Sequence, residues 1–193
     1  MVTREHFIWG LADGVTVLAI ASAFWIGLAA WTAGLSVLLF AAVPILLLGG
    51  LLIWRGSLLR RQAVGISRSS FRNAPKGSQI RKIAALYSAV STAQFLGIAF
   101  VAFICWTLRR PDLTWPLIAL VVSLHFIPLG WVFNVRPYYV LGVLGIVIAL
   151  ISLLAFSGSG KTVAVGLGLG LAAGACAAYM IANAGALGDA ALG

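Results

Sequence analysis

The stretch YYVLGVLGIVIALISLLAF, residues 138–156, carries no charged side chain and is almost entirely apolar. About 20 apolar helical residues cross the core of a bilayer. The stretch does not alternate polar with apolar residues, as a strand of a membrane barrel must. A helix, in contrast, satisfies its own backbone hydrogen bonds in lipid. Residues 138–156 therefore predict a transmembrane helix.

Runs of the same kind lie on both sides of this stretch, at about 8–31, 34–54, 84–108, 115–134 and 162–184. The chain of 193 residues is 62% hydrophobic and only 9% charged, whereas a soluble domain carries about 25% charged residues. A surface with so little charge must face lipid. We therefore expect an all-α polytopic integral membrane protein, in which six transmembrane helices form one domain over residues 1–193.

The longest gap between the runs, residues 55–83, concentrates the basic residues. It contains Arg55, Arg60, Arg61, Arg68, Arg72, Lys76, Arg81 and Lys82, and no acidic residue. Because cytoplasmic loops collect lysine and arginine, this basic loop is expected in the cytoplasm. Six alternating spans then place both termini there too, in a plasma membrane of the bacterial inner-membrane type. The first run shows no cleavage site and is expected to stay as an anchor.

The same loop has two interpretations. Its charge can simply fix the topology of the chain. Alternatively, Arg60, Arg61, Arg68 and Arg72 bind anionic lipid headgroups, where each basic residue contributes about 1 kcal/mol. Since the positive-inside bias accounts for the net charge of +9, we expect membrane lipids as partners and no nucleic acid.

The segment AFSGSGKT, residues 155–162, matches the pattern of a phosphate-binding loop. Such a loop follows a β-strand and opens a helix in an α/β domain. Here the segment joins two apolar runs on the side of the membrane away from the cytoplasm, where nucleotide is scarce. Glycine and serine are ordinary turn residues, so the segment predicts a tight turn and not a nucleotide site.

Three polar residues stand out within the apolar runs: Asp13, Gln94 and His125. Polar groups in membrane spans are rare and usually face an interior or a cavity. Pro128 follows His125 by three residues and frees a backbone carbonyl, an arrangement typical of transporter substrate sites. These residues are therefore candidates for substrate binding or pore lining. The alternative is that they only join helices by hydrogen bonds.

Catalysis finds little support in the sequence. The spans contain no pair of carboxylates and no nucleophile beside a base, and the chain has only two histidines. Cys105 and Cys176 are expected at different depths and show no metal-binding spacing. We expect no enzyme activity, no metal site, no cofactor and no disulfide.

The last run repeats glycine at every fourth residue, at Gly166, Gly170 and Gly174. Small residues at this spacing allow two helices to approach closely. This face is expected either inside the bundle or at the interface of a homo-oligomer.

The segment HFIPLGWVFNVRPYYVLG, residues 125–142, resembles small multi-span bacterial membrane proteins of unassigned function. The resemblance covers about a tenth of the chain and implies no activity. Two hypotheses follow from the residues themselves. The first is a transporter or channel for a small solute or ion, with a polar site around His125. The second is a non-transporting membrane scaffold, lipid-binding protein or partner subunit.

Overall fold

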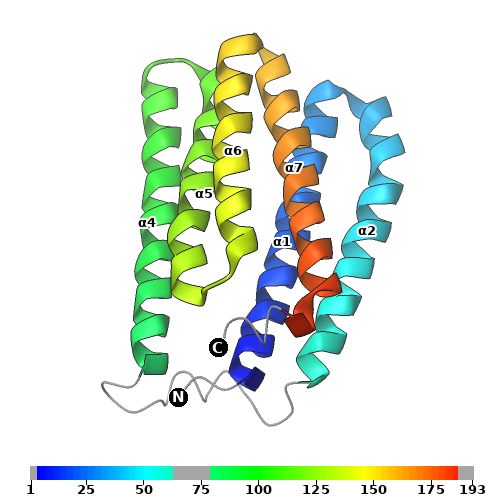
Figure 1. Ribbon diagram of the computed structural model, residues 1–193. Coiled ribbons are helices and arrows are strands. Elements are labelled where there is room, and N and C mark those ends of the chain that lie inside the picture. The colour runs from blue at the N-terminus through cyan, green and yellow to red at the C-terminus, as the bar shows by residue number, and fades with distance from the viewer. Residues whose placement is uncertain (1–3, 63–78, 187–193) are drawn as a thin grey trace.

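The computed structural model describes residues 4–62 and 79–186, and these residues are helical apart from short turns. The helices are α1 (Arg4–Ala33), α2 (Leu35–Gln62), α4 (Gln79–Thr107), α5 (Pro111–Phe133), α6 (Arg136–Ala155) and α7 (Ser159–Ala182). Figure 1 shows them as one bundle of helices that run up and down in alternation. The predicted all-α class is confirmed for the described residues.

Five of the described helices are long and apolar enough to cross a membrane, namely α1, α4, α5, α6 and α7. In α2 the described apolar stretch is shorter, at Leu47–Leu58, and several side chains in the first half of this helix lie outside the described residues. The chain is therefore a helical membrane protein. The sixth crossing, predicted at residues 34–54, stays a prediction.

Two helices continue into the predicted basic loop. Helix α2 ends at Gln62 and α4 begins at Gln79, so that Arg55, Arg61 and Arg81 are helical and exposed. The Arg55 guanidinium lies 5.3 Å from the centre of the Trp54 ring. Both helices thus extend past their apolar segments and carry basic side chains on their ends.

The turns between helices use residues that tolerate unusual backbone angles. Helix α5 is followed by its C-cap residue Asn134, whose φ of 53° is left-handed and whose N–H donates to the Gly130 and Trp131 carbonyls. Asparagine adopts this conformation more easily than most residues. Pro137 then lies in the first turn of α6, where its missing N–H costs nothing. The α5–α6 connection is therefore a tight hairpin.

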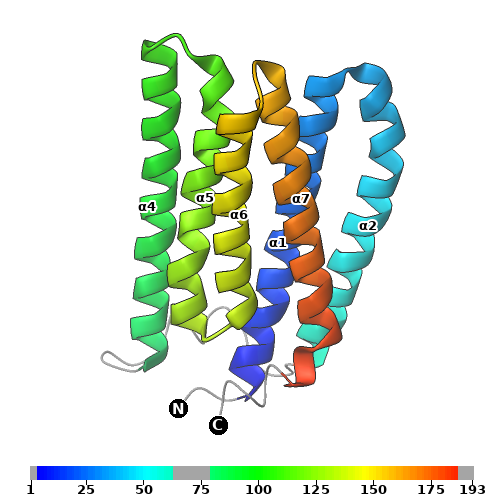
Figure 2. The same cartoon turned by 45° about the horizontal axis from the view of Figure 1, so that its top comes forward.

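The order of the helices across the bundle differs from their order in the chain. Both views show α4, α5, α6 and α7 side by side, with α1 next to α7 and α2 at the far side (Figures 1 and 2). Helix α7 packs extensively on α1, and α1 on α2. One apolar core surrounds Leu18 and Met180, and a second surrounds Trp25 and Val165. The last helix thus joins the α4–α6 part of the bundle to α1 and α2.

Small residues form the interface between α7 and α1. A Cβ atom added to Gly166 would lie 2.6 Å from the Trp25 carbonyl oxygen and 2.8 Å from the Ala29 Cβ atom. The Ser22 hydroxyl donates a hydrogen bond of 2.7 Å to the Gly170 carbonyl. Of the two expected locations for this glycine face, the structure therefore supports the inside of the bundle.

Candidate functional site

His125 lies in the middle of α5 on the side that faces α4. Its ring makes an edge-on contact with Phe126, at 5.7 Å between ring centres, and the Val90 main chain of α4 is close to it. The Nδ1 atom is buried and has no hydrogen-bond partner within residues 4–62 and 79–186. An unpaired buried polar atom costs about 1–3 kcal/mol. The environment of His125 therefore leaves one nitrogen unsatisfied.

Gln94 lies on the stripe of α4 that faces α5. Residues 90, 94 and 97 are spaced by four and three, and so share one helix face. Val90 neighbours His125, and a Cβ atom on Gly97 would lie 2.9 Å from Val121. Gln94 is half-buried, lies along α4 between Val90 and Gly97, and makes no hydrogen bond with any described group. The structure thus places Gln94 and His125 on one helix pair.

Asp13 belongs to α1 and is separated from His125 by a pair of aromatic rings. Phe126 stacks on Tyr138 at 5.9 Å between ring centres, and the Tyr138 hydroxyl packs against Gly14, the neighbour of Asp13. The Asp13 carboxylate is half-buried and has an interaction partner. Two rings, Phe126 and Tyr138, thus lie between His125 and the backbone beside Asp13.

The predicted headgroup-binding arginines are only partly described. Arg61 is exposed in the last turn of α2, and Arg60 belongs to the same turn. The side chain of Arg60 and the whole of Arg68 and Arg72 lie outside the described residues. The interpretation of these arginines as lipid ligands stays a prediction.

An ion-pair cluster lies at the end of the bundle opposite to the basic end of α2. We call this end of the bundle the Lys161 end. The Asp112 carboxylate accepts hydrogen bonds from Arg110 Nε at 3.1 Å and Nη2 at 3.2 Å. Lys161 Nζ approaches the same carboxylate at 3.3 Å, from a side chain that is only 11% exposed. Hydrogen bonding to Asp112 raises the pKa of Arg110 above its ordinary value. The cluster joins the start of α5 to the first turn of α7.

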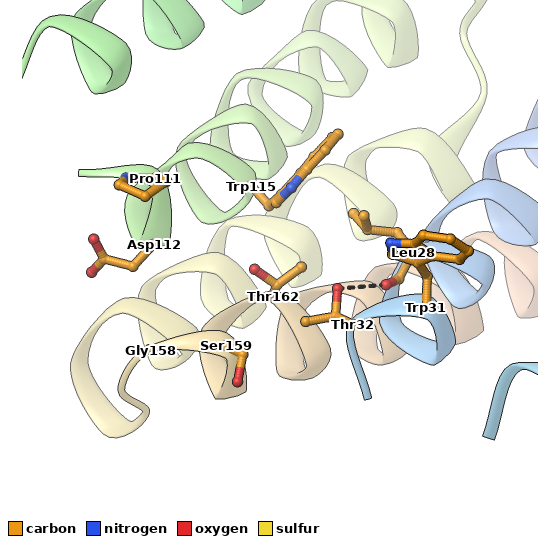
Figure 3. Close-up of a pocket in the computed structure, with 9 residues that line it drawn as sticks. All are labelled: Leu28, Trp31, Thr32, Pro111, Asp112, Trp115, Gly158, Ser159 and Thr162. Atoms are coloured by element: carbon orange, nitrogen blue, oxygen red, sulfur yellow. Dashed lines mark hydrogen bonds between the residues drawn. The ribbon is translucent and has the colours of Figure 1, made fainter. Parts of the chain in front are cut away.

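A hollow of about 670 Å³ opens beside this cluster, between α1, α5 and α7 (Figure 3). Its lining residues are Leu28, Trp31, Thr32, Pro111, Asp112, Trp115, Gly158, Ser159 and Thr162. A second hollow of about 850 Å³ lies next to it, between the end of α4 and the start of α5. His125 lines neither of them.

The turn at residues 157–162 connects two helices, as its sequence predicted. The residue before α7, Gly158, has φ 51° and ψ −133°, a region that essentially only glycine enters. The Ser152 hydroxyl of α6 donates a hydrogen bond of 2.7 Å to the Lys161 carbonyl. Lys161 is therefore held at its backbone by α6 and at its ammonium group by α5.

Sequence reasoning did not find this cluster. One signal was available, because Asp112 is the only acidic residue in the three turns expected away from the cytoplasm. A lone carboxylate among three cations favours an ion pair. Which cation it meets depends on the packing of α5 against α7, and 49 residues separate Asp112 from Lys161.

The arrangement thus defines a helical membrane protein with two polar regions, one inside the bundle and one at its Lys161 end. The chain belongs to DUF7010, a family of unknown function whose model matches residues 4–183. This agrees with the expected resemblance to proteins of unassigned function. Neither the curated proteins nor the solved structures contain a match to the chain.

Proposed function

We propose that the protein is a six-span plasma-membrane protein that binds or passes a small solute or ion at a polar site around His125. The observation that carries this proposal is the buried Nδ1 atom of His125, which has no partner among the described residues. A polar atom in this state gains a hydrogen bond when a ligand, a proton or a water molecule reaches it. Inside a membrane span, such a group marks an ion or solute pathway more often than a structural bond.

The surroundings of His125 support this role. Pro128 lies inside α5 and removes the hydrogen bond to the carbonyl four residues back, at Leu124. Gln94, on the facing stripe of α4, adds an amide with free donors and acceptors. The α4–α5 pair thus carries an imidazole nitrogen, an amide and a backbone carbonyl, and we propose that one small ligand contacts all three. No catalytic role is part of the proposal.

Protons are the simplest ligand of an imidazole, and the first test uses them. Purified protein in liposomes loaded with a pH-sensitive dye is expected to dissipate a proton gradient, and His125→Gln to reduce this flux about tenfold or more. The His125→Gln protein should insert and melt within a few degrees of wild type. Gln94→Leu serves as the second variant and should reduce the flux less, because it leaves the imidazole in place.

A non-transporting subunit is the second candidate function. Two observations favour it: His125 lines neither hollow, and α4 packs mainly against α5, which leaves Phe95, Phe100 and Phe103 exposed for lipid or a partner helix. Under this hypothesis neither wild type nor His125→Gln moves protons or potassium ions. The variant then changes only the melting temperature, since a lost interhelical hydrogen bond costs about 1 kcal/mol.

The orientation of the protein is tested separately. In a background with Cys105 and Cys176 replaced by alanine, Ser159→Cys should react with an impermeant thiol reagent added to intact cells. Ser57→Cys, at the exposed basic end of α2, should react only after the membrane is opened. This result is expected because lysine and arginine stay on the cytoplasmic side. The reverse pattern of labelling would invert the topology.

A further inference from the structure

The strongest unassigned feature is the hollow at the Lys161 end, because a largely buried residue presents an unpaired hydroxyl to it. Thr162 is only 6% exposed and lines the hollow. Its hydroxyl makes no hydrogen bond within the described residues. The hydroxyls of Thr16, Thr32 and Thr107, in contrast, each donate to a carbonyl four residues back in their helices. The Thr162 hydroxyl can therefore still donate a hydrogen bond to a ligand in the hollow.

The first turn of α7 presents further donors to the same space. This helix of 24 residues has no side-chain cap at Gly158 and no acidic residue in its first turn. The Gly160 and Lys161 amides already donate to the Ser157 and Gly158 carbonyls, which leaves the Gly158 and Ser159 amides without a backbone partner among the described groups. The helix dipole favours negative charge at this end. Gly158, Ser159 and Thr162 all line the hollow, and Figure 3 shows Thr162 of α7 among the other lining residues, between Trp115 and Thr32.

The charge of the hollow also favours an anion. Asp112 is the one charged residue of its lining, and Arg110 and Lys161, which lie just outside the lining, both contact this carboxylate. The three side chains leave one net positive charge. A cation would meet the positive end of α7 and two basic groups that already occupy the carboxylate, so that an anion is the better match.

We propose that this hollow binds a phosphate group, with the Thr162 hydroxyl and the Gly158 and Ser159 amides as donors, and with Lys161 and Arg110 as positive charge next to Asp112. Phosphate has the acceptor oxygens that a helix N-terminus and a hydroxyl satisfy together. The site requires no nucleotide fold, and it is independent of the polar site around His125. The phosphate belongs either to a free anion or to a phospholipid headgroup, since Trp31 and Trp115 line the hollow and tryptophan is common at membrane interfaces.

The test measures binding of two probes to the detergent-solubilised full chain. Inorganic phosphate is titrated by calorimetry, and phosphatidylglycerol is added and counted by native mass spectrometry. Wild type should bind at least one of the two. Thr162→Val, which keeps the shape of the side chain, should weaken binding about tenfold, the size expected for one hydrogen bond to a charged group. Thr162→Ser should restore it.

Thr16→Val is the matched control, because the Thr16 hydroxyl donates within α1, near the middle of that helix, and does not line the hollow. It should bind both probes as wild type does. Binding of phosphate alone assigns the site to a free anion, and binding of phosphatidylglycerol alone assigns it to a lipid headgroup. The proposal is overturned if wild type binds neither probe, or if wild type and Thr162→Val bind equally well. Neither result depends on proton flux through the His125 site.

Discussion

Gly166→Ala is expected to destabilise the bundle by about 1–3 kcal/mol, although it adds a single methyl group. The new Cβ atom would lie 2.6 Å from the Trp25 carbonyl oxygen and 2.8 Å from the Ala29 Cβ atom. Both neighbours are rigid parts of α1, so the two helices must separate. The measurement is the free energy of unfolding during titration of mixed micelles with a denaturing detergent.

Gly27→Ala provides the matched control. Gly27 also lies inside a helix, and nothing lies within 4 Å of a Cβ atom built on it. Alanine is a better helix former than glycine by up to about 1 kcal/mol, so this variant should be as stable as wild type or slightly more stable. If Gly166→Ala has the same free energy of unfolding as Gly27→Ala, then α1 and α7 are not in close contact.

Asp112→Asn is expected to lower the free energy of unfolding. Its carboxylate is the counter-charge of Lys161, whose side chain is only 11% exposed, and a nearly buried ammonium without a partner is strongly unfavourable. Lys161→Met should cost less, because Arg110 still pairs with the carboxylate. The double variant should be more stable than Asp112→Asn alone, since it removes the unpaired charge together with its partner.

The unfolding free energies of the four proteins form a double-mutant cycle, which isolates the coupling between the two residues. Arg109→Gln is the control for charge alone. Arg109 lies in the same turn, is exposed and makes no ion pair within the described residues, so its change should stay within about 0.5 kcal/mol of wild type. A coupling energy near zero for Asp112 and Lys161 would contradict the contact.

The class of the protein could be predicted from the sequence because a bilayer demands long apolar helices whatever their tertiary packing. The positions of α5 and α6 follow from the same demand, together with Asn134 and Pro137 between them. The glycine spacing of α7 also predicted a close helix contact. Its partner could not be predicted, because small residues fit any helix, and only the fold shows that α1 supplies Ser22 and Trp25 to this face.

The candidate sites divide in the same way. The depth of His125, Gln94 and Asp13 in their helices could be estimated from residue number alone. Whether they converge depends on the order of helices across the bundle, and here α4 carries Gln94 to the face of α5, while Asp13 lies on α1 beyond Tyr138. The free hydroxyl of Thr162 was equally hidden, since a threonine in a helix usually donates to its own backbone.

The hydrogen bond from Ser22 to Gly170 joins residues that are 148 positions apart. During synthesis α1 enters the membrane long before α7 exists. The small-residue face of α1 and the Ser22 hydroxyl therefore lack their final neighbour until α7 is inserted. A chain that stops before residue 159 leaves this face of α1 open to lipid or to other proteins. Completion of the bundle is therefore tied to the synthesis of α7, and products truncated before this helix are expected to be recognised and degraded as unassembled membrane segments.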